Sequence, residues 1–176
     1  IFVRTARDIL NEESLSYKKQ GLLAKGQQTA GNLFLRNADS IRTIETIIRS
    51  EVEKYRTQFK NRKEGFLINW PKQFNLNGWL ISMKSGGQLA PHMHELGWLS
   101  GAVYINVPFK EKPDSGNFVL CIDDETPSSD CQKIRNEIVD VVTGSLVLFP
   151  ASLMHYTIPF ESSEDRIVLA FDVMPV

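Results

Sequence analysis

The fold is indicated most clearly by one run near the end of the chain, Arg166–Val173, which has the sequence RIVLAFDV. Its β-branched and aromatic residues favour an extended strand. Side chains alternate between the two faces of a strand, so the even-numbered residues from Arg166 to Asp172 would share one face and the odd-numbered, apolar residues the other. An arginine that points into a cavity needs an anion, and a planar guanidinium pairs bidentately with a carboxylate. This run therefore predicts a strand, and Arg166 would bind an anion there if its face of the strand borders a cavity.

Six earlier runs beyond about Gly65 have the same character, and Gly-, Pro-, Asp- or Ser-rich turn signals such as Ser85-Gly86-Gly87 and Glu161–Asp165 separate several of them. The runs are Trp79–Met83, Leu99–Val107, Asn117–Ile122, Glu137–Val142, Ser145–Phe149 and His155–Phe160. Many strands at roughly regular intervals, preceded by helices, predict a jelly roll or barrel with flanking helices.

The N-terminal third predicts helix. Apolar residues recur at helical spacing through Asp39–Lys60, which indicates an amphipathic helix that we expect to pack on its own chain. Thr5–Ala24 has a weaker helical pattern, and Gln27–Phe34 is expected to be irregular. The polar segment Asp123–Asn136 is expected to be a loop that crosses between sheets or covers a cavity mouth.

Length and charge limit the possible functions. The chain has 176 residues, the size of one ordinary domain, and its 20 basic and 21 acidic residues leave a formal net charge of −1. This balance does not indicate the basic surface that binding to nucleic acid or an anionic membrane requires. There is no membrane-spanning run of about 18 apolar residues and no signal-peptide layout, so we expect a cytoplasmic protein. Cys121 and Cys131 are expected to be free thiols, and a first residue other than Met suggests a piece excised from a longer chain.

The three histidines are arranged as a pair and a distant third. His92 and His94 stand two residues apart, so both imidazoles would project from one side of an extended segment. His155 follows a predicted strand and the break at Pro150. Imidazole suits iron, zinc, copper and nickel, and three ligands leave coordination positions open for catalysis. An isolated histidine is more often a surface or hydrogen-bonded core residue, but this arrangement favours a metal site.

Arg166 follows His155 by eleven residues. If the two predicted strands form a hairpin, Arg166 returns alongside the metal-bearing strand. A surface salt bridge with Glu164 or Asp165 is the simpler alternative.

Several of these residues together resemble the 2OG-Fe(II) oxygenase family, from about Trp79 to the end of the chain, with a vaguer echo in Gln28-Thr29. The matching residues are Gly86-Gly87, Pro91-His92-Met93-His94, Leu99–Tyr104, Gly144–Pro150, His155 and Arg166. The resemblance implies a mainly β fold, a double-stranded β-helix with N-terminal helices packed on it. It also implies Fe(II) and 2-oxoglutarate as cofactors. One domain over residues 1–176 is expected, with a helical part at 1–64 and the β-helix at 65–176.

The resemblance also implies roles for particular residues. His92, His94 and His155 would hold iron, and Arg166 would bind 2-oxoglutarate. Tyr104 and Ser100 could hydrogen-bond 2-oxoglutarate, although a buried tyrosine is more often a core residue. No catalytic side chain is expected beyond the metal centre.

The pattern departs from the wider superfamily at one point, because that superfamily usually has His-x-Asp or His-x-Glu where this chain has His94 as the second histidine of the pair. Glu95 offers an alternative third ligand with His92 and His155. It would point to the opposite side of a regular strand, so this set needs a bulge or turn at Met93.

The implied reaction couples decarboxylation of 2-oxoglutarate with O2 to oxidation, by default hydroxylation, of a small molecule or a peptide or protein. Two alternatives stay open: a three-histidine cupin-type metalloenzyme that does not use 2-oxoglutarate and leaves Arg166 without a ligand, and a non-catalytic jelly-roll binding module. The substrate and the oligomeric state are not indicated by the sequence.

Overall fold

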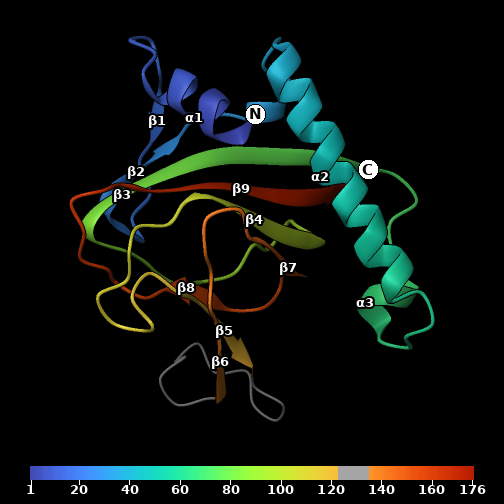
Figure 1. Cartoon of the computed structure of the whole chain (residues 1–176). Helices are drawn as coiled ribbons and strands as arrows, with labels where there is room; N and C mark the ends of the chain where they lie inside the picture. The colour runs from blue at the N-terminus through green and yellow to red at the C-terminus, as the bar shows by residue number, and fades with distance from the viewer. Residues whose placement is uncertain (123–134) are drawn as a thin grey trace.

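The computed structural model describes residues 1–122 and 135–176 and shows a curled antiparallel sheet with helices on one side (Figure 1). The elements are α1 (Phe2–Leu10), β1 (Tyr17–Lys18), β2 (Leu23–Thr29), the 3-10 helix η1 (Leu33–Leu35), α2 (Asp39–Gln58), α3 (Gly65–Ile68), β3 (Phe74–His92), β4 (Leu99–Asn106), β5 (Phe118–Ile122), β6 (Arg135–Val139), β7 (Leu146–Pro150), β8 (His155–Thr157) and β9 (Arg166–Pro175). The predicted mainly β fold with flanking helices is confirmed.

Strand β3 links the two sides of the curled sheet. The strand order is β6-β5-β8-β3-β9-β4-β7, and β2 also pairs with β3. The first part of β3 pairs with β9, from Phe74↔Pro175 to Met83↔Arg166, whereas its last residues pair with β8, ending at His92↔His155. Because one 19-residue strand has different partners along its length, the β9 side and the β8 side of the sheet curl around a common interior.

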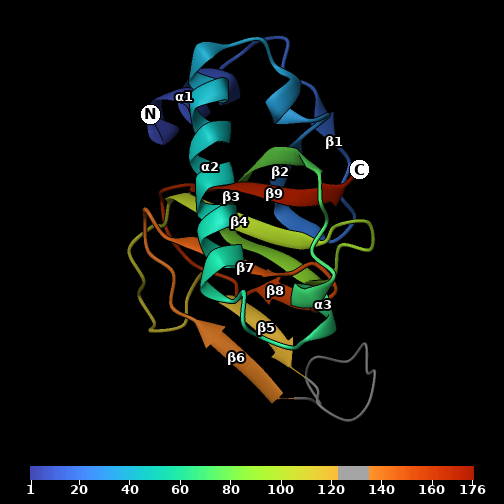
Figure 2. The same ribbon diagram turned by 90° about the vertical axis from the view of Figure 1, so that its right-hand side faces the viewer.

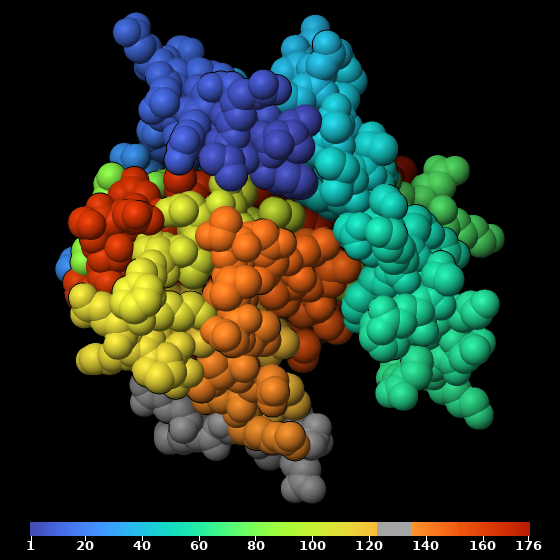
Figure 3. Space-filling model, viewed as in Figure 1, coloured from blue at the N-terminus to red at the C-terminus, as the bar shows by residue number. Residues whose placement is uncertain are grey.

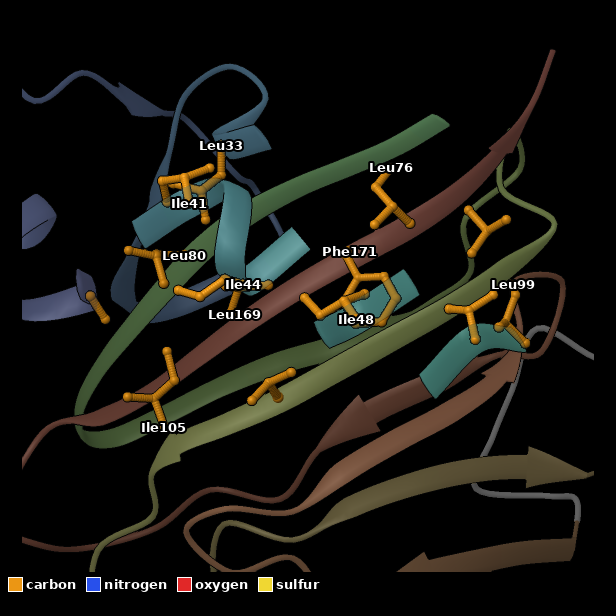
Figure 4. Close-up of a cluster of buried hydrophobic side chains, with 14 of the residues drawn as sticks. Leu33, Ile41, Ile44, Ile48, Leu76, Leu80, Leu99, Ile105, Leu169 and Phe171 are labelled. Carbon is orange, nitrogen blue, oxygen red and sulfur yellow. The ribbon is translucent and has the colours of Figure 1, made fainter. Parts of the chain in front are cut away.

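Helix α2 covers the outer face of the β3–β9–β4 side (Figure 2). Its buried residues Ile41, Ile44, Ile48 and Val52 recur every three or four positions and form one stripe. In Figure 4 these isoleucines lie against side chains of β3, β4 and β9, among them Leu80, Leu99, Leu169 and Phe171. Burying an aliphatic side chain of this size contributes about 1.5–3 kcal/mol, so this stripe is what holds the helix in place. Figure 3 shows the N-terminal segment, in blue, at the top of the molecule and α2, in cyan to teal, along its right-hand side.

The alternation predicted for β9 is confirmed. Leu169, Phe171 and Val173 are buried in the core beneath α2, while Arg166 and Asp172 line an interior pocket on the opposite face. A Cβ atom on Gly101 of β4 would lie 2.2 Å from the ring of Phe171, so only glycine lets that ring lie across the neighbouring strand.

The predicted helix over Thr5–Ala24 is wrong beyond Leu10. The chain instead forms the hairpin of β1 and β2, and β2 includes residues that were expected to be irregular. Gln27 pairs with Ser82 and Gln28 with Ile81 of β3. These partners lie more than fifty residues away in sequence, so local periodicity could not indicate the strand.

Two expectations about turns are also wrong. Ser85-Gly86-Gly87 lies inside β3, where Gly86 adopts φ +73° and its N–H donates to the carbonyl of Phe160 at 2.6 Å. This is an irregularity within a strand rather than a turn between strands. Strands β8 and β9 do not form the expected hairpin, because β8 pairs with β3 and β5, and β9 pairs with β3 and β4.

Cys121 is disulfide-bonded, so the expectation of a free thiol is wrong for this residue, while Cys131 lies outside the described residues. Most of the predicted loop Asp123–Asn136 lies there too, and its last two residues belong to β6. None of the helices in the described ranges is long and apolar enough to cross a membrane.

Candidate active site

A pocket of about 540 Å³ lies inside the curl of the sheet and contains every histidine of the chain. Its apolar walls include Trp79 and Ile81 of β3, Phe118 of β5 and Phe149 of β7. Arg166 lines the same pocket. The pocket therefore joins an apolar wall, an imidazole cluster and a buried cation, which is the combination expected of a small-molecule site.

The three histidines form a cluster whose candidate ligand atoms all lie within 4.8 Å of one another. His92 ends β3 and His155 begins β8, and these two residues are directly paired across the strands. His94 lies two residues past the end of β3, in a segment held by a hydrogen bond from its backbone N–H to the carbonyl of Ala151 at 2.9 Å. The ring centroids are 4.2 to 5.2 Å apart. The pairing of β3 with β8 thus brings the distant histidine to the local pair.

Hydrogen bonds determine which nitrogen of each ring is free. Nδ1 of His92 lies 2.8 Å from the carbonyl oxygen of Ala90, and Nδ1 of His155 lies 2.9 Å from that of Leu153. A carbonyl oxygen can only accept, so both Nδ1 atoms carry the hydrogen. Nδ1 of His94 donates in the same way to the Asp172 carboxylate, at 2.6 Å. In the neutral form of each ring the lone pair is therefore on Nε2, the atom available to a metal ion.

Burial keeps two of these rings uncharged. It lowers the pKa of His92, and it lowers the pKa of His155 to about 3, with the nearby His92 as the second cause. Metal ions bind neutral imidazole, so at neutral pH neither ring must first lose a proton.

Arg166 is a buried cation, only 2% exposed. Its Nε–H donates to the carbonyl of Gly116 at 3.1 Å, and its guanidinium carbon lies 5.1 Å from the centre of the Tyr104 ring. Burial lowers the pKa of Arg166, and among the described residues no acidic side chain pairs with it. The neighbouring Asp165 instead binds Lys84, at 2.6 Å. A buried charge without an ion partner is costly, so this guanidinium is placed to bind an anion from solution.

Tyr104 and Ser100 are placed differently from each other. Tyr104 lines the pocket, and burial raises its pKa to about 12, so it is a neutral phenol beside Arg166. Ser100 shares that face of β4 but does not line the pocket. Its hydroxyl donates to Asp172 at 2.6 Å and lies 3.0 Å from Nδ1 of His94. Ser100 therefore contacts a histidine rather than the space for a co-substrate.

Glu95 is exposed and is not among the residues that line the pocket. Of the two ligand sets that the sequence allowed, the structure brings together the one containing His94. The polypeptide turns after His94, so the glutamate next to it points away from the cluster.

Two pocket residues were not predicted as site residues from the sequence, although Gln28 stood in the vaguer part of the family resemblance. Asp172 shares the inward face of β9 with Arg166, and a carboxylate on a buried face was a signal that it needed a partner. Gln28 is 7% exposed, lines the pocket and has no side-chain hydrogen bond within the described part of the chain. No local signal could have placed Gln28 there, because its position depends on the pairing of β2 with β3.

The residues present fit iron and 2-oxoglutarate. Three imidazole nitrogen donors suit Fe(II) and leave part of its coordination sphere open. A buried guanidinium in the same pocket suits a carboxylate, and the volume accommodates a five-carbon diacid beside a metal ion.

The comparisons with known proteins agree with this fit. Residues 77–172, more than half of the chain, match the family described as "Putative 2OG-Fe(II) oxygenase". No curated protein sequence matches the chain.

Solved structures show the same fold at low sequence identity. A prolyl-4-hydroxylase of Pseudomonas putida is 14% identical, with a TM-score of 0.68 over 99% of this chain and 84% of that one. HygX from Streptomyces hygroscopicus, solved with nickel and 2-oxoglutarate, is 16% identical, with a TM-score of 0.68 over 99% and 78%. The epimerase SnoN from nogalamycin biosynthesis is 15% identical, with a TM-score of 0.70 over 99% and 71%. The expected double-stranded β-helix is thereby confirmed.

The family match, the shared fold and the fit of the pocket lead to one conclusion: the chain belongs to the 2OG-Fe(II) oxygenase family and is an Fe(II)- and 2-oxoglutarate-dependent dioxygenase.

Proposed function

We propose that this chain hydroxylates its substrate, with His92, His94 and His155 as the iron ligands and Arg166 as the anchor of 2-oxoglutarate. The observation that carries the proposal is the presence, in one pocket, of three converging imidazoles with free Nε2 atoms and a buried guanidinium without an acidic partner. In this reaction one oxygen atom of O2 enters succinate, with release of CO2, and the other enters the substrate as a hydroxyl group.

The histidines hold and orient the metal. Each Nδ1–H bond, to Ala90, Leu153 or Asp172, helps to fix the orientation of its ring and leaves Nε2 as the atom for the metal ion. Bound iron with its co-substrate supplies the oxidising chemistry, and the protein supplies position and shielding.

Arg166 gives 2-oxoglutarate its direction in the pocket. The guanidinium can bind the carboxylate that is farther from the keto group, and this leaves the keto acid end for the metal. Tyr104 packs against the guanidinium, and the backbone carbonyl of Gly116 holds its Nε–H, so the cation is already positioned before the co-substrate binds. Ile81 and Val168 add apolar surface to the same pocket.

The remaining polar groups of the pocket favour a substrate that is neutral or anionic, either a small molecule or a peptide. Asp172 is the one acidic residue among the described lining residues, and its carboxylate is already bonded to His94 and Ser100. Among the described lining residues, no acceptor charge is therefore left for an amine. Gln28 and Thr157 are buried polar side chains without a side-chain hydrogen bond in the described ranges, so they are placed to bind amide or hydroxyl groups.

The test is succinate formation from 2-oxoglutarate by the Fe(II)-loaded enzyme in air, first without substrate and then with a panel of neutral, anionic and cationic compounds. We expect slow succinate formation that a neutral or anionic compound accelerates, with a product that carries one oxygen atom from isotopically labelled O2. His155→Ala should abolish succinate formation.

The matched control is Glu95→Ala, which removes the exposed alternative ligand and should leave succinate formation unchanged. Undiminished turnover in His155→Ala, or its loss in Glu95→Ala, would overturn the ligand assignment. An oxidised product that carries no oxygen atom from O2 would overturn hydroxylation and leave the oxygenase assignment intact.

A further inference from the structure

We propose that Asp172 is a positioning residue that supplies, through His94, the negative charge that a ligand set of three histidines lacks. The inference rests on the proposed function, since it takes His94 as an iron ligand. The wider superfamily combines a ligand atom and a charge in one Asp or Glu. In this chain, the ligand atom would come from His94 and the charge from Asp172.

The contact between the two side chains is short and buried. Nδ1 of His94 lies 2.6 Å from Oδ1 of Asp172, and the side chains are 16% and 10% exposed. The hydroxyl of Ser100 donates to the same Oδ1, also at 2.6 Å, and Ser100 is fully buried. Two donors on one oxygen fix the carboxylate against the imidazole on the side of the ring opposite Nε2.

The backbone holds both partners in place. Asp172 lies in the middle of a sheet, paired with Asn77 of β3 on one side and with Ser100 of β4 on the other. The segment that carries His94 packs directly on the carboxylate: a Cβ atom on Gly97 would lie 3.3 Å from Cγ of Asp172 and 3.0 Å from Cβ of Ala151. The strand pairing of Asp172 and the packing of Gly97 against it therefore bring His94 and Asp172 together.

The contact between His94 and Asp172 brings a negative charge close to the proposed metal ligands. The three imidazoles contribute no negative charge to a divalent ion, and Asp172 is the only acidic residue among the described lining residues. A carboxylate that accepts the other N–H of a ligating histidine fixes its tautomer and makes its free nitrogen a stronger donor. Asp172 is placed to do this for His94, whereas His92 and His155 donate to neutral carbonyls.

The decisive variant is Asp172→Asn, which keeps the size and an acceptor oxygen but removes the charge. Mn(II) affinity of the purified apo-protein, measured by the loss of the free-ion signal in electron paramagnetic resonance, should weaken by about 10- to 100-fold. The melting temperature without metal should stay close to that of the wild type. The matched control is Asp165→Asn, an acidic residue next to β9 that pairs with Lys84 and should leave Mn(II) affinity unchanged.

The outcomes distinguish a failure of this inference from a failure of the proposed function. Equal Mn(II) affinity in Asp172→Asn and wild type, with His155→Ala still defective, would overturn the inference alone. Equal affinity in His155→Ala and wild type would overturn the proposed ligand set. A purely structural role predicts a lower melting temperature without metal and an unchanged Mn(II) affinity.

If Asp172→Asn does not fold, Ser100→Ala decides the question, because it removes one hydrogen bond to the carboxylate and keeps the charge. Mn(II) affinity should then weaken by about two- to tenfold. An unchanged affinity in Ser100→Ala would overturn the inference in that case.

Discussion

The two faces of strand β9 show how this domain separates stability from chemistry. Leu169, Phe171 and Val173 face α2 and form part of the main core, whereas Arg166 and Asp172 face the pocket from the same ten residues of chain. The core face holds apolar side chains, because a buried polar group without a hydrogen-bonding partner is costly. The pocket face instead carries two charges, and their burial is what makes them useful for binding. Alternation along the strand thus places core residues and pocket residues next to each other in sequence. A substitution on one face should therefore leave the property of the other face unchanged.

The largest expected effect comes from His155→Ala on the pocket side. A ligand that binds only the folded state stabilises it, by about 4 kcal/mol at a thousand times its Kd. Mn(II) should therefore raise the melting temperature of the wild type strongly, and this rise should disappear in His155→Ala, because two imidazoles remain where three are needed. Thermal unfolding with and without Mn(II) measures the difference. An undiminished rise in the variant would show that Mn(II) binding does not depend on His155.

Arg166→Ala should produce the next largest effect, on the co-substrate alone. Truncating one partner of a buried, hydrogen-bonded charge pair costs about 2–5 kcal/mol, so the Kd for 2-oxoglutarate should rise by roughly 30- to 5,000-fold. Arg166→Lys should fall between this variant and the wild type, since it keeps the charge but loses the bidentate geometry. Calorimetric titration of the Mn(II)-loaded protein measures both. A 2-oxoglutarate affinity that does not depend on Arg166 would favour a metalloenzyme that works without this co-substrate.

Leu169→Ala tests the core face of the same strand. Emptying a buried leucine site costs about 2–5 kcal/mol, so the free energy of unfolding should fall by that amount in urea titrations. At low urea, where the variant is folded, its affinities for Mn(II) and 2-oxoglutarate should equal those of the wild type. A loss of either affinity would show that the two faces are coupled rather than separate.

The smallest expected effect comes from Lys84→Ala, outside both faces. Lys84 pairs with Asp165 just before β9, but its side chain is 72% exposed. An exposed ion pair contributes about 0–1 kcal/mol, so unfolding, metal binding and co-substrate binding should all stay close to those of the wild type. A change of several kcal/mol would mean that this end of β9 is held by more than its pairing in the sheet.

Elements with a strong local pattern could be predicted from the sequence. Helix α2 and strands β4, β7 and β9 lie within about two residues of their predicted ranges, because the apolar spacing in each matches one period. The histidine pair was found for a related reason, since two residues at positions i and i+2 of an extended segment must share a side.

Features that depend on distant pairing could not be predicted in this way. Strand β2 and the continuation of β3 through Gly86 exist because partners far away in sequence supply their hydrogen bonds. The hairpin expected between β8 and β9 failed for the same reason, yet Arg166 still reaches the pocket because β3 pairs with both strands. Ser100 was expected on the correct face of its strand, but Asp172, only 2.6 Å away, determines what its hydroxyl contacts.

The central claim is that one pocket binds Fe(II) through its histidines and 2-oxoglutarate through Arg166. An anaerobic titration of the apo-protein with Fe(II) and then 2-oxoglutarate tests it most directly, with Arg166→Ala titrated in parallel. A visible metal-to-ligand charge-transfer band should appear when 2-oxoglutarate is added to the wild type, and in the variant it should be weaker or need far more co-substrate. Iron binding without the band, or no iron binding, would contradict the claim.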